Sequence, residues 1–577
     1  MKRNIMKILL IYPYFLEDRL NEEEIAAVPI GLYYIAAVLK ESGYDAEILN
    51  LYNAGDNRDG IRKVLVEKRP DVIGFSIFNA NRWGGIDVAR IAKEINPQIK
   101  VVFGGPGPTF LWEHLLRHFK EIDYAVIGEG EKTFLRLVEA IENNDDVSGI
   151  AGIAFRKNGE PIGTASREPV RDLDILPNPA HEFAFQHVSS TRGCPGDCTF
   201  CGSRRFWGKS VKFHSAKYFV DQLELLFKKG VNFFFFSDDT FTLKKGHVIE
   251  ICREILARKL SITWFAISRV DCVSDEILYW MRKAGCVQIS YGVESGSEKI
   301  RGRLNKRINT EEIKRAFKLT KKYGILARAY FIYGCPEETW DTIKETLDLI
   351  EEIKPLSIIF YILDIFPGTA LYEDFIKRTG STDDVWLEKI EDILYFETDP
   401  DLSKELVLDF GERLRSAYHK MLPEFAASIE LIDKKELYPL HADFLSRLGM
   451  TFSHGDYARI ESLTEKDDVA ERLYVKSLEY FPDHRAFLGL GIVMQKRRAF
   501  EKSIDVLSKG IEHFPDSEQL NMCIGVSYMN LGEFEKALPY FLKFENSPES
   551  LSRAQECYRA LGDMEKVEEI SARGKRS

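Results

Sequence analysis

Short apolar runs alternate with amphipathic helical patterns twice along this 577-residue chain, and this alternation constrains the fold most. The first series of apolar runs lies at residues 6–14, 45–52, 71–78, 99–105 and 123–130. The helical pattern after the first run closes on Gly43, which is a typical helix stop. Five strands that alternate with helices predict a doubly wound, Rossmann-like parallel sheet over residues 1–150. Ligands of such sheets bind beyond the carboxyl ends of the strands.

The second series follows a segment at residues 151–185 that has the pattern of a hairpin and a Pro-rich linker. Its six runs lie at residues 187–193, 231–241, 262–270, 286–296, 327–336 and 356–369. Six strand and helix units predict a partial or full α/β barrel over residues 186–395. The chemistry of such a barrel gathers at the carboxyl ends of its strands.

The C-terminal part of the chain is predicted to be all-α. Residues 396–464 have mixed helical patterns, and we expect a helical connector there. From residue 465 the sequence repeats, since "EYFPD", "EHFPD" and "ENSPE" begin at Glu479, Glu512 and Glu545, 33 residues apart. This period predicts tetratricopeptide-like repeats over residues 465–577, and their concave side would suit a protein or peptide partner.

Composition excludes several classes of protein. The net charge of -11 and the absence of a basic block argue against a nucleic-acid partner. No apolar run reaches membrane-spanning length, and the N-terminus runs directly into the first strand pattern instead of a signal peptide. The nine cysteines show no disulfide-like spacing. We therefore expect a cytoplasmic protein with reduced thiols.

Three of these cysteines, Cys194, Cys198 and Cys201, lie within eight residues. The spacing C-x3-C-x2-C suits three irons of a cubane cluster and leaves the fourth iron open to a substrate or cofactor. The alternative is a zinc site whose fourth ligand is His187 or His214. Zinc sites usually space their cysteines in two separated pairs, so we favour the iron–sulfur cluster.

The stretch "CPGDCTFC" after a strand resembles the signature of the radical S-adenosylmethionine (radical SAM) superfamily. The resemblance implies a 4Fe-4S cluster on Cys194, Cys198 and Cys201, whose open iron is chelated by S-adenosylmethionine. It also implies reductive cleavage of S-adenosylmethionine to a 5'-deoxyadenosyl radical. The electron would come from a donor such as flavodoxin or ferredoxin.

The same resemblance implies S-adenosylmethionine contacts at later strand ends. Ser237, Asp238 and Asp239 stand where the family places polar groups that face the methionine amino group, although one of the two aspartates can instead cap a helix. Glu294 stands where the family has an acid that binds the ribose. The remaining candidates are Phe200 near the adenine, Ser268 and Arg269 for the methionine carboxylate, and Arg328 for an anionic cofactor or substrate. No catalytic residue is assigned.

A doubly wound domain before such a barrel resembles the cobalamin-binding class of the superfamily. "GGPGPT" and "GEGEKT" are similar to the fourth and fifth strand loops of that class. The Asp-x-His-x-x-Gly motif is absent, so no histidine from it would bind the cobalt. The resemblance implies a cobalamin site at Tyr14, Ser76, Phe78, Asn79, Gly104, Gly105, Pro106, Gly128, Glu129 and Gly130. The alternative is a domain that keeps the fold and binds no corrinoid.

His114 and His118 are spaced i and i+4 on a predicted helix. This spacing suits a metal pair, but we expect two solvated side chains on the helix face.

The resemblance implies a radical SAM enzyme with a partial α/β barrel and with a 4Fe-4S cluster, S-adenosylmethionine and cobalamin as cofactors. The leading hypothesis is methyl transfer to an unactivated carbon, or to a phosphinate phosphorus, of a small molecule or peptide. One alternative is radical cyclisation or rearrangement without methyl transfer. A second alternative, from another class, is an adaptor protein that acts through its repeats.

Overall fold

The computed structural model describes residues 6–16, 26–55 and 57–574. The chain divides into two compact units. Unit 1 comprises Met1–Phe317, Ala327–Ile353 and Ser357–Leu414, and unit 2 comprises Lys318–Leu326, Lys354–Leu356 and Arg415–Ser577. Both α/β regions predicted from the sequence lie in unit 1, apart from Lys318–Leu326 and Lys354–Leu356 of the second one.

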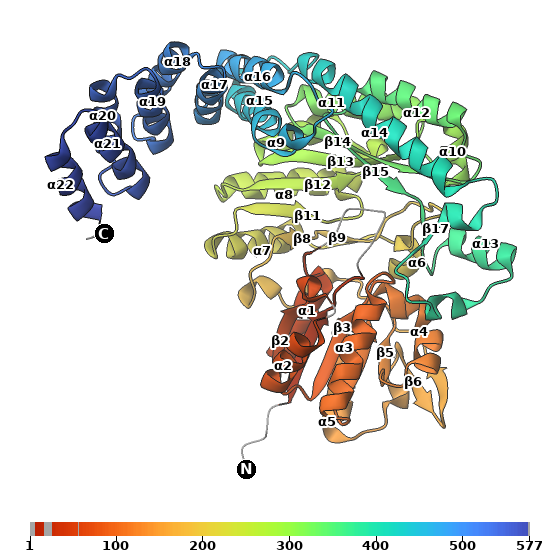
Figure 1. Ribbon diagram of the computed structural model, residues 1–577. Coiled ribbons are helices and arrows are strands. Elements are labelled where there is room, and N and C mark those ends of the chain that lie inside the picture. Colours follow the sequence, from red (N-terminus) through yellow and green to blue (C-terminus); the bar gives the residue numbers. More distant parts are fainter. Residues whose placement is uncertain (1–5, 17–25, 56, 575–577) are drawn as a thin grey trace. The chain divides into compact units, whose positions relative to one another are not determined.

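The first α/β region contains a seven-stranded sheet of order β2-β1-β3-β4-β5-β6-β7 (Figure 1). Strands β1 to β5 are parallel, and β6 and β7 add an antiparallel hairpin at one edge. The order 2-1-3-4-5 is one of the common doubly wound arrangements. The strands are β1 (Lys7–Tyr12), β2 (Asp45–Asn50), β3 (Val72–Ser76), β4 (Lys100–Gly104), β5 (Tyr124–Val126), β6 (Ile153–Lys157) and β7 (Glu160–Gly163).

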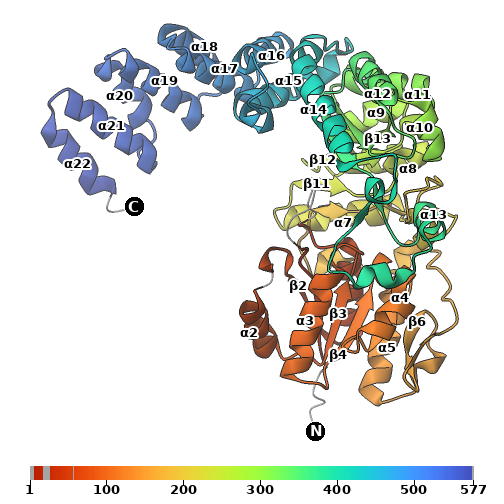
Figure 2. The same cartoon turned by 45° about the vertical axis from the view of Figure 1, so that its right-hand side comes forward.

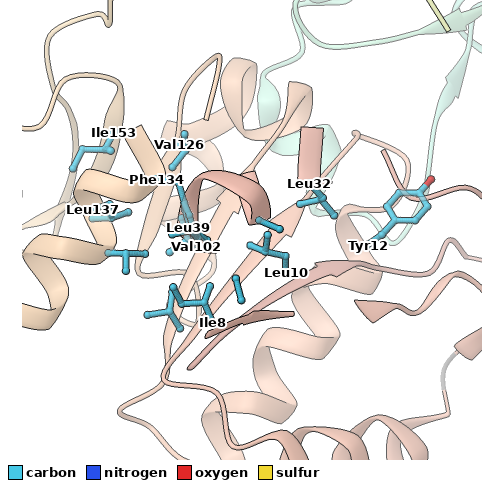
Figure 3. Close-up of a cluster of buried hydrophobic side chains, with 14 of the residues drawn as sticks. Ile8, Leu10, Tyr12, Leu32, Leu39, Val102, Val126, Phe134, Leu137 and Ile153 are labelled. Atoms are coloured by element: carbon cyan, nitrogen blue, oxygen red, sulfur yellow. The ribbon is translucent and has the colours of Figure 1, made fainter. Parts of the chain in front are cut away.

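Helices cover both faces of this sheet. The helices are α1 (Ile30–Glu41), α2 (Arg58–Lys68), α3 (Arg82–Ile95), α4 (Pro106–His118) and α5 (Glu131–Asn143). Helices α1 and α5 close one face, where Leu39 and Phe134 share a buried cluster with Val102 of β4 (Figure 3). The neighbouring Phe103 points to the opposite face, because side chains alternate along a strand. Helix α3 packs there, since a Cβ on Gly85 would meet the Phe103 ring at 3.2 Å.

The second α/β region is a six-stranded sheet of order β15-β14-β13-β12-β11-β8, in which every described strand pair is parallel. Strands β8 and β15 are the two edges of this sheet, so the barrel is partial rather than closed. The strands are β8 (His187–Val188), β11 (Phe233–Phe236), β12 (Thr263–Ser268), β13 (Cys286–Glu294), β14 (Leu326–Tyr333) and β15 (Ser357–Ile362). Its helices are α6 (Ser203–Trp207), α7 (Ala216–Lys228), α8 (Lys245–Ala257), α9 (Asp275–Lys283), α10 (Glu298–Arg303), α11 (Thr310–Lys322), α12 (Trp340–Ile353) and α13 (Ala370–Thr379).

Two short antiparallel pairs flank this sheet. One joins β9 (Thr191–Arg192) and β10 (Lys212–Phe213), and the other joins β16 (Asp364–Ile365) and β17 (Ile393–Leu394).

The C-terminal region is helical, as predicted. Each helix from α15 to α22 packs against the next one along the chain (Figure 2). Among the described residues, none of the helices has both the length and the apolar character needed to cross a membrane. The helices are α14 (Lys404–Ala427), α15 (Tyr438–Ser453), α16 (Lys466–Tyr480), α17 (His484–Lys496), α18 (Phe500–His513), α19 (Glu518–Asn530), α20 (Phe534–Leu542), α21 (Pro548–Ala560) and α22 (Met564–Gly574).

Candidate active site

The three clustered cysteines lie on one loop, residues 193–202, between β9 and α6; we call it the cluster loop. A Cβ on Gly196 would lie 3.4 Å from the Cys194 sulfur and 3.9 Å from the Cys198 sulfur, so both thiols face this glycine. Thiolates are the ligands of iron–sulfur clusters, and this donor set on one glycine-containing loop fits a cluster with one open iron.

The two histidines considered as a fourth zinc ligand are engaged elsewhere. His214 contacts the Tyr34 hydroxyl through Nε2 and the Asp174 carboxylate through Nδ1, each at 3.1 Å. His187 is hydrogen bonded through Nδ1 to Ser237 and stacks on Phe235. The geometry therefore disfavours the zinc alternative for this loop.

A buried ion pair lies beside the cluster loop. Lys306 donates to Glu294 at 2.7 Å, and both side chains are more than nine-tenths buried. Burial raises the pKa of Cys198, while the nearby Lys306 charge lowers it, which places the pair close to this thiol. Glu294 has a φ of 67°, a left-handed conformation that a non-glycine residue adopts at a cost. Such strain at the end of a barrel strand is typical of a functional position.

Two polar groups at the end of β11 lie against the same loop. The Thr240 hydroxyl is 3.5 Å from the Cys194 sulfur. Asp239 accepts a hydrogen bond of 2.6 Å from Ser203, which directly follows the loop. Sequence alone does not distinguish Asp239 from Asp238, because the two residues are adjacent and both are acidic.

Asp238, which is predicted to face the methionine amino group, lies inside the protein. Its side chain is buried and accepts hydrogen bonds from the hydroxyl groups of Ser190 and Thr191. Burial raises the pKa of Asp238 to about 6, although these hydroxyl groups lower it. Its carboxylate is therefore used inside the protein, whereas Asp239 is the aspartate beside the cluster loop.

Ser268 is also buried, and its hydroxyl is paired with that of Thr242. Arg269 does reach the cluster loop, since a Cβ on Gly196 would lie 3.4 Å from its guanidinium, and it binds Asp271 with two hydrogen bonds. Its neighbour Ser268 is thus the less accessible of the two residues predicted to hold the methionine carboxylate.

The other predicted contacts occupy less constrained positions. Phe200 is half-buried in the cluster loop, and Ser237 is exposed at the end of β11. Arg328 lies on the partly exposed face of β14, where it donates to Ser357 at 2.9 Å. The roles of these residues remain predictions.

A cavity opens at the carboxyl ends of the N-terminal sheet; we call it the Gly-rich cavity. Its walls come from strands β1, β3, β4 and β5, from the starts of α1 and α5, and from α6. It is lined by Leu10, Gly31, Leu32, Ile35, Gly74, Phe75, Ser76, Val102, Gly104, Gly105, Val126, Gly128, Glu129, Gly130, Glu131, Phe134, Phe206 and Trp207. Six of the ten residues predicted to bind cobalamin are in this set: Ser76, Gly104, Gly105, Gly128, Glu129 and Gly130.

Four predicted cobalamin residues lie outside the lining of this cavity: Tyr14, Phe78, Asn79 and Pro106. The Tyr14 hydroxyl donates to Asp87 at 3.2 Å, and Phe78 packs edge-on against Tyr12. Asn79 is buried and donates to the Glu391 carbonyl, while Pro106 begins α4. A sequence pattern locates a strand end but not the direction of each side chain that follows it.

Glycines shape the walls of the cavity, two of them because the protein itself leaves no room for a side chain. A Cβ on Gly74 would meet both Leu10 and Phe134 at 2.9 Å, and Gly105 has a φ of 99° with the Ile77 carbonyl 2.8 Å from its Cβ position. Gly31, in contrast, has nothing within 4 Å of its Cβ position. Backbone without side chains lets a ligand approach closely, and apolar walls suit the ring systems of a cobalamin. The cavity therefore fits part of such a cofactor.

Sequence reasoning missed the contribution of α6. Phe206 and Trp207, which follow the cluster loop directly, line the Gly-rich cavity. The Trp207 ring lies under the cations of Arg192 and Lys212, at 5.4 and 5.5 Å. The aromatic pair "FW" just after the last cysteine was the available signal, but only the fold brings it to the other domain.

A buried ion-pair network joins the two α/β regions. Glu129 accepts from Arg192 at 3.0 Å and from Lys212 at 2.7 Å, and Glu131 accepts from Arg192. Arg167 pairs with Glu129 as well. Burial lowers the pKa of Arg192, but Glu131 and Glu129 raise it more, so the guanidinium stays charged. The network ties the "GEGEKT" loop to the strand that leads into the cluster loop.

The predicted solvation of the two helix-face histidines is wrong for His114. Its side chain is only 3% exposed, and that of His118 is 31% exposed. The imidazole rings lie 4.8 Å apart.

Known proteins share both regions. A model of the radical SAM superfamily matches residues 188–350, and a model of the B12 binding domain matches residues 25–138. An uncharacterized methyltransferase of Pyrococcus horikoshii is 32% identical over 381 residues, which cover 64% of this chain and 83% of that protein. The chain belongs to the radical SAM superfamily.

Two further similarities extend this result. An anaerobic magnesium-protoporphyrin IX monomethyl ester cyclase of Rubrivivax gelatinosus is 30% identical over 391 residues, covering 64% of this chain and 70% of that protein. The radical S-adenosylmethionine methyltransferase TsrM from Kitasatospora setae, solved with cobalamin and a 4Fe-4S cluster, has a TM-score of 0.60 at 15% identity. The match covers 82% of this chain and 100% of the TsrM chain, and at 15% identity it shows a shared fold.

The predicted radical SAM enzyme with a cobalamin-binding domain is confirmed by the two family matches. The two matches also support the three predicted cofactors, and the helical C-terminal region agrees with the predicted all-α part. Enzymes of this superfamily use small-molecule substrates and an electron donor.

Proposed function

We propose that this protein is a cobalamin-dependent radical SAM methyltransferase that acts on an unactivated carbon. The observation that carries the proposal is the position of the cluster loop. Arg192 precedes it and binds Glu129, and Trp207 follows it and lines the Gly-rich cavity. Residues 192–207 would thus contribute to both cofactor sites, and a substrate that reacts with both cofactors needs the two sites close together.

When bound, the cluster supplies the electron that cleaves S-adenosylmethionine to an adenosyl radical, and cobalamin supplies a cobalt that carries the methyl group. Cys194, Cys198 and Cys201 would hold the cluster. Glu294 would accept hydrogen bonds from the ribose hydroxyls, with Lys306 setting its position and charge. The buried walls of the Gly-rich cavity would exclude water from the corrinoid.

Methyl transfer is favoured by the relative of Pyrococcus horikoshii, which is named a methyltransferase. The second candidate is radical cyclisation without methyl transfer, and the cyclase of Rubrivivax gelatinosus favours it. The two reactions differ in their products, because only methyl transfer converts S-adenosylmethionine to S-adenosylhomocysteine.

The test uses the anaerobic holoenzyme, a reductant, trideuteromethyl-labelled S-adenosylmethionine and a small-molecule extract. We expect 5'-deoxyadenosine, S-adenosylhomocysteine and a product that carries the label. Cys198→Ser should abolish 5'-deoxyadenosine, whereas Cys523→Ser in the helical region should not. Formation of 5'-deoxyadenosine with no S-adenosylhomocysteine would contradict methyl transfer and favour the cyclisation.

We also propose that α16–α22 form tetratricopeptide-like repeats. Gly491 and Gly525 are 34 residues apart, and each is packed under a large side chain, Leu507 or Phe541, at 2.5 Å from its Cβ position. A period of this length and small-to-large packing are typical of such repeats. The repeats would bind a protein partner or a peptide substrate, which a pull-down with full-length protein tests. The adaptor alternative requires binding without any cleavage of S-adenosylmethionine.

We also propose domain bounds and a cytoplasmic location for this protein. The cobalamin-binding domain would comprise residues 1–150, and a linker would follow at residues 151–185. The partial barrel would comprise residues 186–395, the helical connector residues 396–464 and the repeats residues 465–577. Free cysteines suit the cytoplasm, where flavodoxin or ferredoxin would supply the electron.

A further inference from the structure

His114, His118 and Asp384 form a cluster of three metal-ligand types outside the site described above. One atom of each, two imidazole nitrogens and a carboxylate oxygen, lies within 4.8 Å of the other two. The histidines belong to α4 of the cobalamin-binding domain, and Asp384 belongs to a short 3-10 helix at Asp383–Leu387 that follows α13. Two segments more than 260 residues apart thus supply one cluster.

The distances within the cluster suit coordination better than hydrogen bonding. Asp384 Oδ1 lies 3.6 Å from His114 Nδ1 and 3.3 Å from His118 Nε2. Hydrogen bonds between such groups are usually about 2.7–3.2 Å long. Two ligands of one tetrahedral zinc ion, each about 2.0–2.1 Å from it, are roughly 3.4 Å apart. The His118 side chain is partly exposed and is free to turn toward the ion.

His114 lacks the partner that a buried imidazole needs. Its side chain is 97% buried, and its Nε2 has no hydrogen-bond partner among the described residues. A buried polar atom of this kind calls for an unseen water, and the other ring nitrogen, Nδ1, is the one that faces Asp384.

We propose that His114, His118 and Asp384 bind one zinc ion. Imidazole nitrogens with one carboxylate oxygen suit this ion, and a water would complete its four ligands. The same three ligand types also hold ferrous iron in other proteins, so the test has to separate the two metals.

The ion would attach residues 383–391 to the cobalamin-binding domain. This segment already contacts α3, because Arg82 and Trp83 donate to backbone carbonyls of Glu391 and Glu388. A metal between Asp384 and α4 would add a second attachment a few residues upstream. The site would thereby hold residues 383–391 against the domain that contains the Gly-rich cavity.

The experiment starts from anaerobic protein whose cluster is loaded, so that the three cluster thiols are not available to zinc. Zinc sulfate and, separately, a ferrous salt are added, and the bound metal is counted after gel filtration. We expect one zinc per chain in addition to the iron of the cluster. His118→Ala and Asp384→Asn should each weaken zinc binding at least 100-fold, whereas His181→Ala, which removes another exposed histidine, should not change it.

Equal zinc binding in the wild type and in both variants would overturn the proposal. Uptake of iron without zinc would overturn the zinc assignment. Amide hydrogen exchange provides the second measurement: zinc should slow exchange in residues 383–391 of the wild type but not of Asp384→Asn. Zinc binding without this slowing would overturn the fastening role.

Discussion

Arg192, two residues before the first cluster cysteine, donates a 3.0 Å hydrogen bond to Glu129 in the wall of the Gly-rich cavity. Both side chains are at least nine-tenths buried, and Arg192 also binds Glu131. A buried charge needs its partner, because the protein interior solvates ions poorly. The position of the cluster loop therefore depends on charges of the cobalamin-binding domain.

Replacing Arg192 should destabilise unit 1. In Arg192→Met two buried carboxylates lose their shared cation, and breaking a buried ion pair in this way costs about 3–5 kcal/mol. Urea unfolding of the two proteins measures the loss, and Arg192→Lys should recover part of it. The matched control is Arg205→Met, because the pair of Arg205 with Glu373 is largely exposed. The control should lose less than about 1 kcal/mol, and an equal loss in both variants would contradict the role of the network.

Removing the Trp207 ring should weaken cobalamin binding and leave the cluster intact. The half-buried ring lines the cavity, and a ligand that covers it would lose about 1.5–3 kcal/mol of contact on its removal, or roughly tenfold or more in affinity. Equilibrium dialysis of cobalamin against Trp207→Ala, with iron content measured in parallel, checks this. Trp340→Ala is the control, since Trp340 is 49% exposed and lies outside the cavity lining. Unchanged cobalamin affinity in Trp207→Ala would remove this side chain from the site.

Most of the architecture could be predicted from periodicity. The two series of apolar runs identified both parallel sheets, and the cysteine spacing identified the cluster loop, because these signals are local in sequence. The glycines at 104, 105, 128 and 130 were found for the same reason, since they follow strand ends. The partial barrel was predicted from the resemblance to the radical SAM superfamily and not from periodicity, because closure depends on which strands become edges.

The missed features all depend on contacts between distant segments. Asp238 is held inside the protein by the hydroxyl groups of Ser190 and Thr191, which follow β8, and Asp239 is left beside the cluster loop. His114 has the sequence pattern of a surface residue, yet the segment around Asp384 lies beside it. Such effects appear only when the fold joins residues that sequence spacing keeps apart.

A methyl group at position 292 should impair S-adenosylmethionine binding. A Cβ on Gly292 would lie 2.4 Å from Glu294 Oε1 and 2.8 Å from Lys306 Nζ, so Gly292→Ala must displace this buried ion pair. We expect weaker S-adenosylmethionine binding by the cluster-loaded protein at unchanged iron content, measured by equilibrium dialysis. Gly302→Ala is the matched control, because nothing lies within 4 Å of its Cβ position. Equal affinity in the two variants would argue against a role of Glu294 in binding.

Glu338 should make the stability of the barrel depend on pH. Its buried carboxyl accepts hydrogen bonds from the amides of Gly334 and Cys335, and burial raises its pKa to about 7 from an ordinary 4.5. Between these two pH values the folded state binds more protons than the unfolded state. The free energy of unfolding therefore falls as pH rises from 4.5 to 7, by on the order of 3 kcal/mol.

Urea unfolding of the wild type and Glu338→Gln between pH 4.5 and 8 tests this sign. A glutamine stays neutral, so the variant should lack this part of the decline and be less sensitive to pH than the wild type. The adjacent Glu337 is the control: it is exposed and paired with Lys299 and Arg303, and Glu337→Gln should retain the decline between pH 4.5 and 7. A wild-type stability that rises over this range, or a Glu338→Gln variant with the same decline, would show that the carboxyl is ionised in the folded protein. The hydrogen bonds from Gly334 and Cys335 would then outweigh its burial.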